Sequence, residues 1–254
     1  SDLHSETSQA IHGMLDSLDC AWMNPPAADA AAHHKPFQWT IAQQLGLKLP
    51  RTLVTTRAEA ARAFIESVRP GRVVFKAFLA AARRWRETRW VGPEDIERLA
   101  LVRYAPVIFQ EYVPGVDLRI TLVGDTIHAA EIDARHTSYE VDMRMVVGEA
   151  RLRAVNLPAS LEERLRALQR RLGLVYGAID MRRTAEGEHV FLEVNPAGQW
   201  LFVEERCGLP ISQSVAGFLA RAADAARPAR HGRTAPPART RTHSPHASTA
   251  TSPG

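Results

Sequence analysis

The feature that most constrains the fold is a predicted β-hairpin near the end of the chain, VYGAIDMRRTAEGEHVFLEVNPAG at residues 175–198. Its turn centres on Glu186-Gly187, so Asp180 should lie opposite Glu193 on the partner strand. Because side chains alternate along a strand, Asn195 shares the face of Glu193. One face therefore presents two carboxylates and an amide. The other face is expected to be apolar throughout, with Val175, Gly177, Ile179 and Met181 against Val190, Leu192 and Val194.

Two carboxylates that face each other across a strand pair repel unless a positive charge lies between them. An all-oxygen set of Asp180, Glu193 and Asn195 suits a hard cation, Mg²⁺ before Ca²⁺. The alternative is an ordinary salt-bridged surface, in which arginines such as Arg182 or Arg183 neutralise the two acids. Both interpretations remain open on the hairpin alone.

Other familiar catalytic motifs are absent from the sequence. It has no G-x-x-x-x-G-K-[ST], G-x-G-x-x-G, G-x-S-x-G or H-E-x-x-H pattern. Phosphate chemistry would therefore depend on the acidic hairpin and on cationic side chains. Only three of the 32 basic residues are lysines, at Lys35, Lys48 and Lys76, so a lysine here marks a place that favours a compact point charge.

Composition excludes several classes of protein. No run of 18 apolar residues is present, and the N-terminus lacks the apolar stretch of a signal peptide, so we expect a cytoplasmic protein without a membrane partner. Cys20 and Cys207 fit neither a disulfide framework nor a zinc site. Residues 227–254 carry five arginines and no acid, so the pI of 9.4 describes a tail that we expect to be disordered. The rest of the chain offers no basic face, and no nucleic-acid partner is expected.

The order of elements predicts an α+β fold with antiparallel sheets. Helices are expected at 35–45, 56–68, 93–103 and 160–172, and from Ser212 onward; strands are expected at 51–55, 72–78 and 106–113, with hairpins at 117–132 and 175–195. Two of the helices follow capping-box patterns, Thr56 with Glu59 and Ser160 with Glu163.

In that order, the elements resemble the ATP-grasp superfamily. The stretches that carry the resemblance are HHKPFQWTIAQQLGLKLPRTLVT (33–55), VVFK (73–76), FQEYVPGVDLRITLVGD (109–125), VDMR (141–144) and FLEVNPAGQWLFVEERCGLPI (191–211). Within the superfamily, they are most similar to the microviridin-type maturases, which form side-chain ester or amide cross-links in ribosomal precursor peptides (graspetides). The resemblance implies two α+β subdomains that grip ATP, and a precursor peptide as substrate. A homodimer is implied by analogy alone.

The resemblance also implies individual roles. Lys35 and Lys76 would contact ATP phosphates, Gln110, Glu111 and Val113 the adenine edge, and Asp117 the ribose hydroxyls. Arg119 and Arg144 would be catalytic and face the phosphates or an acyl phosphate, while Asp180, Glu193 and Asn195 would hold one or two Mg²⁺ ions.

The implied organisation places a linker or a remnant of an N-terminal domain at 1–30, one ATP-grasp subdomain at 31–112, a second with the magnesium site at 113–226, and the tail beyond. Two departures from the family are visible: its additional N-terminal domain is not recognisable, and the segment after Lys76 has no glycine until Gly92. In that segment, Arg83, Arg84 and Arg86 would replace backbone amides at the phosphates, or Trp85 and Trp90 would form a lid over the peptide, or the segment is a solvated basic loop. Two other functions stay open, a ligase of the ribosomal-protein glutamate type and a truncated ATP-binding module without turnover.

Overall fold

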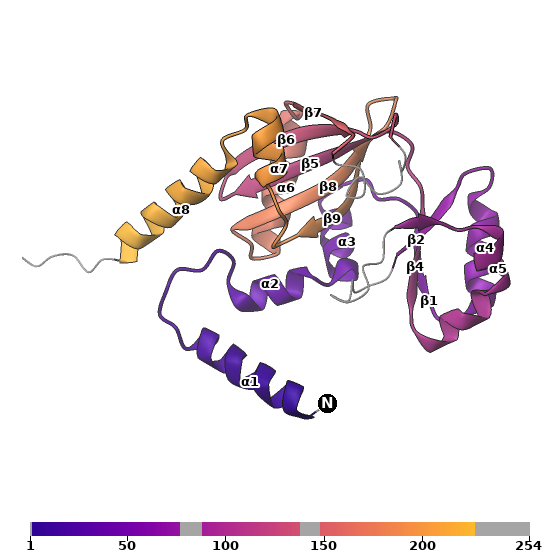
Figure 1. Cartoon of the computed structure of the whole chain (residues 1–254), viewed down its shortest axis with the longest axis horizontal. Coiled ribbons are helices and arrows are strands. Elements are labelled where there is room, and N and C mark those ends of the chain that lie inside the picture. Colours follow the sequence, from indigo (N-terminus) through magenta and orange to yellow (C-terminus); the bar gives the residue numbers. More distant parts are fainter. Residues whose placement is uncertain (1, 77–87, 138–147, 227–254) are drawn as a thin grey trace, which may run out of the picture.

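The chain forms two antiparallel sheets that lie next to each other (Figure 1). The structure is a computed structural model and describes residues 2–76, 88–137 and 148–226. The strand order is β1-β4-β2-β3 in the first sheet and β7-β6-β5-β8-β9 in the second. The predicted α+β class with antiparallel sheets is confirmed.

The first sheet is covered on one side by a small helical layer (Figure 1). Its strands are β1 (Thr52–Thr55), β2 (Val73–Lys76), β3 (Arg89–Trp90) and β4 (Val107–Glu111), and its helices are α4 (Ala58–Val68), α5 (Pro93–Glu97) and the 3-10 helix η1 (Leu99–Tyr104). Ala61, Ile65 and Val68 recur at helical spacing along α4, and all three are buried against a cluster that includes Phe109.

The second sheet has apolar layers on both faces. Its strands are β5 (Val116–Val123), β6 (Thr126–Asp133), β7 (Arg151–Ala154), β8 (Tyr176–Arg183) and β9 (His189–Asn195). Leu118, Ile120 and Leu122 pack in one cluster with α3 (Lys35–Gln44) and α6 (Ala159–Arg171). Val123 belongs to a separate cluster with α7 (Leu201–Cys207) and α8 (Ile211–Ala226), as the alternation of side chains along β5 requires.

The N-terminal segment was not predicted to have helices. It forms α1 (Asp2–Asp16), which extends away from the sheets in Figure 1, and α2 (Pro26–Ala32), which leads into α3. Strands β3 and β7 and helix α7 were also not predicted.

The predicted register of the last hairpin is correct at one end and wrong at the other. Asp180 pairs with Glu193, as predicted, but a β-bulge follows, and Met181 pairs with Phe191 in place of Leu192. Phe191 is fully buried in the core, and Leu192 lies on the opposite face with Glu193. The predicted apolar face is therefore wrong at Leu192, and also at Val190, which pairs with Arg182, because the extra residue of a bulge reverses the alternation beyond it.

Both predicted capping boxes are also wrong. Helix α4 begins at Ala58 after Arg57, whose N–H donates to the Thr55 hydroxyl (2.9 Å) in a turn that replaces the cap. Helix α6 begins at Ala159, one residue before Ser160, with Pro158 as the N-cap.

Candidate active site

A pocket lies where the two sheets meet, and both sheets line it. The first sheet and the segment after β4 contribute Lys76, Gln110, Glu111 and Val113. The second sheet contributes Asp117, Asp180 and Glu193. Seven of the eleven residues assigned a role from the sequence therefore line one pocket.

A row of charged side chains crosses the second sheet at the pocket. Arg119 on β5 is paired with Asp180 on β8, which is paired with Glu193 on β9. The Arg119 Nη1 contacts both carboxylate oxygens of Asp180 at 2.8 and 3.0 Å, and Lys35 forms an ion pair with Glu193. Each acid thus has its own cation.

Helix α3 brings Lys35 to this row through its hydrogen bonds to the outer edge of β9. Gln38 is buried, and its side chain accepts from the Val194 N–H and donates to the Val194 carbonyl, both at 2.7 Å. The Trp39 indole donates to the Leu192 carbonyl (3.0 Å). These bonds satisfy the free edge of β9 as another strand would, and they hold the first turn of α3 beside Glu193.

Arg119 is held rigidly beneath the loop that follows β9. It is buried, and its Nη2 donates to the Gln199 carbonyl at 3.0 Å. A Cβ on Gly198 would lie 2.7 Å from Nη2 and 2.5 Å from the Ala178 Cβ, so only glycine fits there. Burial alone would lower the pKa of Arg119, but the adjacent Asp180 carboxylate reverses this and raises the pKa.

The loop at 196–198 is anchored by two residues that the sequence did not single out. Asn24 donates to the Pro196 carbonyl (3.0 Å), and the Tyr176 hydroxyl donates to the Gly198 carbonyl. Burial raises the pKa of Tyr176 to about 12, so the hydroxyl stays protonated and remains a donor. An asparagine before two prolines looks like a turn residue, and nothing local indicates such a long-range contact.

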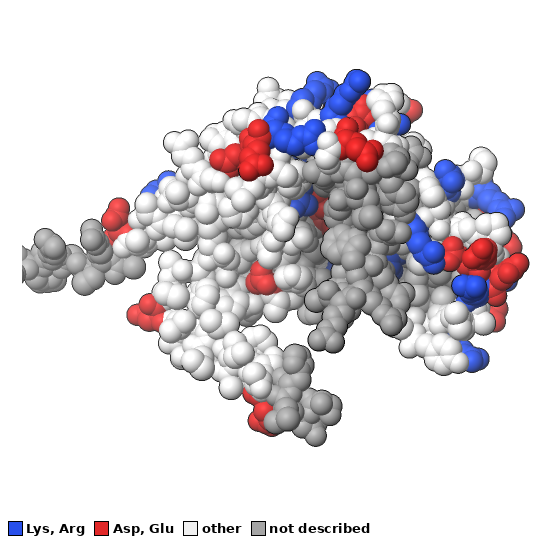
Figure 2. Space-filling view, in the orientation of Figure 1, with Lys and Arg blue, Asp and Glu red and all other residues white. Residues whose placement is uncertain are grey.

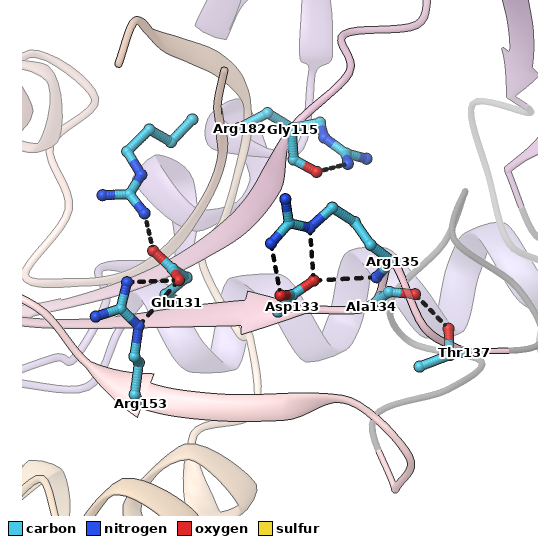
Figure 3. A network of polar contacts seen from close by, with 9 residues as sticks. Gly115, Glu131, Asp133, Ala134, Arg135, Thr137, Arg153 and Arg182 are labelled. Carbon is cyan, nitrogen blue, oxygen red and sulfur yellow. Dashed lines mark hydrogen bonds and ion pairs between the residues drawn. The ribbon is translucent and has the colours of Figure 1, made fainter. Parts of the chain in front are cut away.

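Arg182 and Arg183, the arginines of the salt-bridged alternative, form ion pairs with acids other than Asp180 and Glu193. Arg182 forms its ion pair with Asp117 (Nη1 to Oδ1, 3.5 Å), and Arg183 forms one with Glu131. Figure 3 shows Glu131 held between Arg153 and a second guanidinium group, and Arg182 donating to the Gly115 carbonyl (2.6 Å). The salt-bridged alternative is therefore wrong about Arg182 and Arg183, but both acids are salt-bridged, Asp180 to Arg119 and Glu193 to Lys35.

The last three assigned residues differ in their surroundings. The side chain of Gln110 lines the pocket, is buried, and donates to the Thr52 hydroxyl on the neighbouring strand β1 (3.0 Å). Asn195 is exposed, and its Oδ1 accepts from the Ala197 N–H (3.0 Å). Arg144 and most of the loop after Lys76 lie outside the described residues.

The outer surface carries charges of both signs (Figure 2). Lys and Arg are interspersed with Asp and Glu over α4 and α5 and over the ends of β6 and β7, and the described residues form no single-sign field in this view. In the part of the chain that the structure describes, no three His, Cys, Asp or Glu side chains converge as a metal-ligand group. Within those same ranges, no helix is long and apolar enough to cross a membrane.

Comparison with known proteins decides the family. No protein-family profile and no curated protein sequence match this chain. Among solved structures, it is similar to macrocyclase MdnC bound with precursor peptide MdnA from Microcystis aeruginosa MRC, with 33% identity and a TM-score of 0.77 over 85% of this chain and 70% of that one. The chain belongs to the RiPP-associated ATP-grasp ligases.

Two further solved structures support membership of the RiPP-associated ATP-grasp ligases. The ligase from Chryseobacterium gregarium, in complex with ADP and a leader and core peptide, is 27% identical with a TM-score of 0.77, over 87% of this chain and 69% of that one. The ATP-grasp ligase PsnB, complexed with minimal precursor, Mg and ADP, is 27% identical with a TM-score of 0.62, over 78% of this chain and 62% of that one. The pocket of this RiPP-associated ATP-grasp ligase lies between its two sheets, next to the charged row.

Proposed function

We propose that this chain uses ATP to activate a carboxylate of a ribosomal precursor peptide and to join it to a hydroxyl or amine of the same peptide. The observation that carries the proposal is the pocket in which Lys76 and the end of β4 face the acidic row of the second sheet. In this proposal, residues 31–112 and 113–226 act as two subdomains that hold the nucleotide between them, with α3 of the first packed against the sheet of the second.

The end of β4 is suited to bind the adenine through backbone groups. The N–H groups of Glu111 and Tyr112 already donate to the Arg51 and Arg72 carbonyls, at 2.9 and 2.8 Å. Val113 is the next residue and lines the pocket. Its N–H is the first after the two N–H groups that form these hydrogen bonds within the sheet. We therefore assign the adenine contact to the backbone at Glu111 and Val113, with Gln110 supporting the strand through its side chain.

The charged groups are suited to bind a polyphosphate. Lys76, at the end of β2, lines the pocket, and Lys35 lies beside Glu193 at the start of α3. A lysine that contacts a carboxylate through a flexible stem can exchange it for a phosphate oxygen with little rearrangement. Asp117 lines the pocket beyond the segment 112–115, where it would accept hydrogen bonds from the ribose hydroxyls.

The donor set fits a hard divalent cation. Asp180 and Glu193 line the pocket. Asn195 lies outside that lining, two residues after Glu193 on β9, and would add an amide oxygen through the lone pair that its bond to the Ala197 N–H leaves available. With only two carboxylates, a Mg²⁺ ion here would need phosphate oxygens to complete its coordination. When bound, magnesium would neutralise charge on the phosphates.

The chemistry needs no protein nucleophile. A carboxylate oxygen of the peptide forms a bond to the γ-phosphorus, and ADP leaves with the electron pair of the broken P–O bond. A hydroxyl or amine then bonds to the acyl carbon, loses its proton, and phosphate leaves. Arg119, buried and held by Asp180 and the Gln199 carbonyl, supplies fixed positive charge beside this reaction, and we expect Arg144 to add a second.

Thermal shift with ATP tests the site, with and without Mg²⁺, on the wild type, Glu193→Ala and Glu188→Ala. Glu188 is the matched control, because it lies on the same hairpin as Glu193 but outside the pocket, where it forms an exposed ion pair with Lys48. We expect a magnesium-dependent rise in melting temperature for the wild type and Glu188→Ala and none for Glu193→Ala. An equal rise in all three proteins would refute the assignment of the magnesium site.

Mass spectrometry tests the reaction. A precursor peptide incubated with the enzyme, ATP and Mg²⁺ should lose the mass of one water per cross-link, whereas amino-acid addition would increase the mass.

We further propose a cytoplasmic homodimer. Light scattering after size-exclusion chromatography tests the dimer, which a monomeric mass at working concentration would exclude.

A further inference from the structure

Arg182 is a buried cation that contacts the connection between the two sheets. It lies on β8, two residues after Asp180, with a side chain that is 6% exposed. Its Nη2 donates to the Gly115 carbonyl (2.6 Å), its Nη1 lies 3.5 Å from the Asp117 Oδ1, and its guanidinium carbon lies 4.8 Å from the centre of the Tyr112 ring. One side chain therefore holds the 112–115 segment at two points and also contacts Asp117.

The Tyr112 ring extends this contact into the first sheet. It meets Trp90 edge to face, with ring centres 4.5 Å apart and an interplanar angle of 64°. Arg72 covers Trp90 at 3.7 Å, and Trp90 pairs with Val74 in the sheet. A continuous series of contacts thus runs from β3 of the first sheet to Arg182 on β8 of the second, and two of its members, Tyr112 and Arg182, line the pocket.

This arrangement is a poor way to stabilise a fold. A buried ion pair gains little unless its geometry is close, and the Asp117–Arg182 contact is longer than a hydrogen bond. An apolar side chain of similar volume would fill the same space without the desolvation of a charge. The arginine instead contributes orientation. Its planar guanidinium group fixes the positions of the Gly115 carbonyl, the Tyr112 ring and the Asp117 carboxylate relative to one another.

We propose that Arg182 is a positioning residue for nucleotide recognition, which holds Asp117 and the 112–115 segment in the geometry that selects a ribose. The inference rests on the proposed function, in which Asp117 accepts hydrogen bonds from the ribose hydroxyls. A carboxylate oriented by a cation on Oδ1 presents a defined plane to two neighbouring hydroxyl donors. Loss of the arginine removes the contact that fixes the plane of the carboxylate, so we expect selectivity for the ribose to be lost before affinity for the phosphates.

Isothermal titration calorimetry on the full chain with Mg²⁺ and ATP, 2′-deoxy-ATP or 3′-deoxy-ATP tests the inference. For the wild type, we expect each deoxynucleotide to bind roughly ten-fold more weakly, the size of one hydrogen bond to a charged group. In Arg182→Met, that preference should fall to about two-fold or less, mainly through weaker binding of ATP. Asp117→Asn should lose the preference in the same way, and adding Arg182→Met to it should cause little further change.

Arg183→Met is the matched control, because its arginine is the next residue on β8 and is paired with Glu131 outside the nucleotide pocket. It should keep the full ribose preference. Arg182→Lys keeps the buried charge, and hence the fold, but cannot contact Gly115 and Asp117 in one plane, so its preference should be intermediate. Thermal melting of each variant identifies any that are unfolded.

The outcomes separate the inference from the function on which it rests. An unchanged ribose preference in folded Arg182→Met or Arg182→Lys overturns the positioning role alone. ATP binding by the wild type without any ribose preference also overturns it, while leaving the ATP site intact. Absence of any magnesium-dependent nucleotide binding by the wild type overturns the proposed function together with the inference.

Discussion

Replacement of Asn24 by alanine should destabilise the fold more than its place in an irregular segment suggests. The Asn24 amide donates to the Tyr176 and Pro196 carbonyls at 2.9 and 3.0 Å. Its oxygen accepts from the Val175 and Tyr176 N–H groups, both at 2.7 Å. All four hydrogen-bonding capacities of one buried amide are therefore used to join residue 24 to the start of β8 and to the loop after β9.

The expected loss follows from what alanine leaves behind. Two backbone N–H groups and two carbonyls lose their partner at a position that is only 8% exposed. One intramolecular hydrogen bond contributes about 1 kcal/mol, and a buried group without a partner costs roughly 1–3 kcal/mol. Allowing for partial access of water, we expect the free energy of unfolding to fall by about 3 kcal/mol. For a chain of this length that corresponds to a melting temperature lower by roughly 6–12 °C.

Urea denaturation followed by far-ultraviolet circular dichroism measures this change. Asn156→Ala is the matched control, because Asn156 is exposed, and it should stay within about 0.5 kcal/mol of the wild type. Asn24→Asp keeps the acceptor for both N–H groups but turns a carboxylate toward two carbonyls, so it should also destabilise. A loss below about 1 kcal/mol for Asn24→Ala would refute the reasoning, since it would mean that water replaces the amide at little cost.

Three further predictions concern the backbone at Gly115, the edge of strand β9 and the pH dependence of stability. Gly115→Ala should cost at least about 3 kcal/mol or prevent folding, because φ is +149° and the added Cβ would lie 2.1 Å from the Arg183 carbonyl oxygen. Gln38→Leu should cost about 2 kcal/mol and speed hydrogen exchange at the Val194 amide, whose partner it removes. Burial lowers the pKa of His128 below its usual 6.5, so the unfolded state binds more protons, stability falls as pH drops below 6.5, and His128→Gln should flatten that dependence.

Each of these has its own control. Gly148→Ala meets nothing within 4 Å and should leave the melting temperature unchanged, so an equal loss at Gly148 and Gly115 would contradict the steric argument. Normal protection of the Val194 amide in Gln38→Leu would contradict the edge argument. A pH profile between 5 and 7 that is identical with and without His128 would assign the titration to another group; burial also lowers the pKa of His189.

Much of the architecture follows from short-range rules that can be applied to the sequence alone. The turn at Gly124 and the alternation on either side predicted the β5–β6 hairpin, and the repeat of Leu161, Leu165 and Leu168 predicted the buried face of α6. The pairing of Asp180 with Glu193 followed from counting outward from a turn. These features depend on dihedral preferences and periodicities that operate within a few residues, so they are readable without the fold.

The details of the site depend on contacts between distant residues. The bulge that turns Leu192 to the pocket lies where α3 forms hydrogen bonds with the edge of β9 and where Phe191 packs in the core. Local pairing rules cannot predict either contact, because both involve residues far apart in the sequence. Arg119 and Lys35 neutralise acids that lie 61 and 158 residues away along the chain.

The sequence by itself thus determined the fold class, the family resemblance and the acidic pair, because these depend on local pattern and residue type. Only the tertiary structure decided which cation neutralises which acid, and that Arg182 belongs to Asp117 and the segment that joins the sheets. The physical reason is that charge pairing depends on distances of a few ångströms, and strand order and packing set those distances.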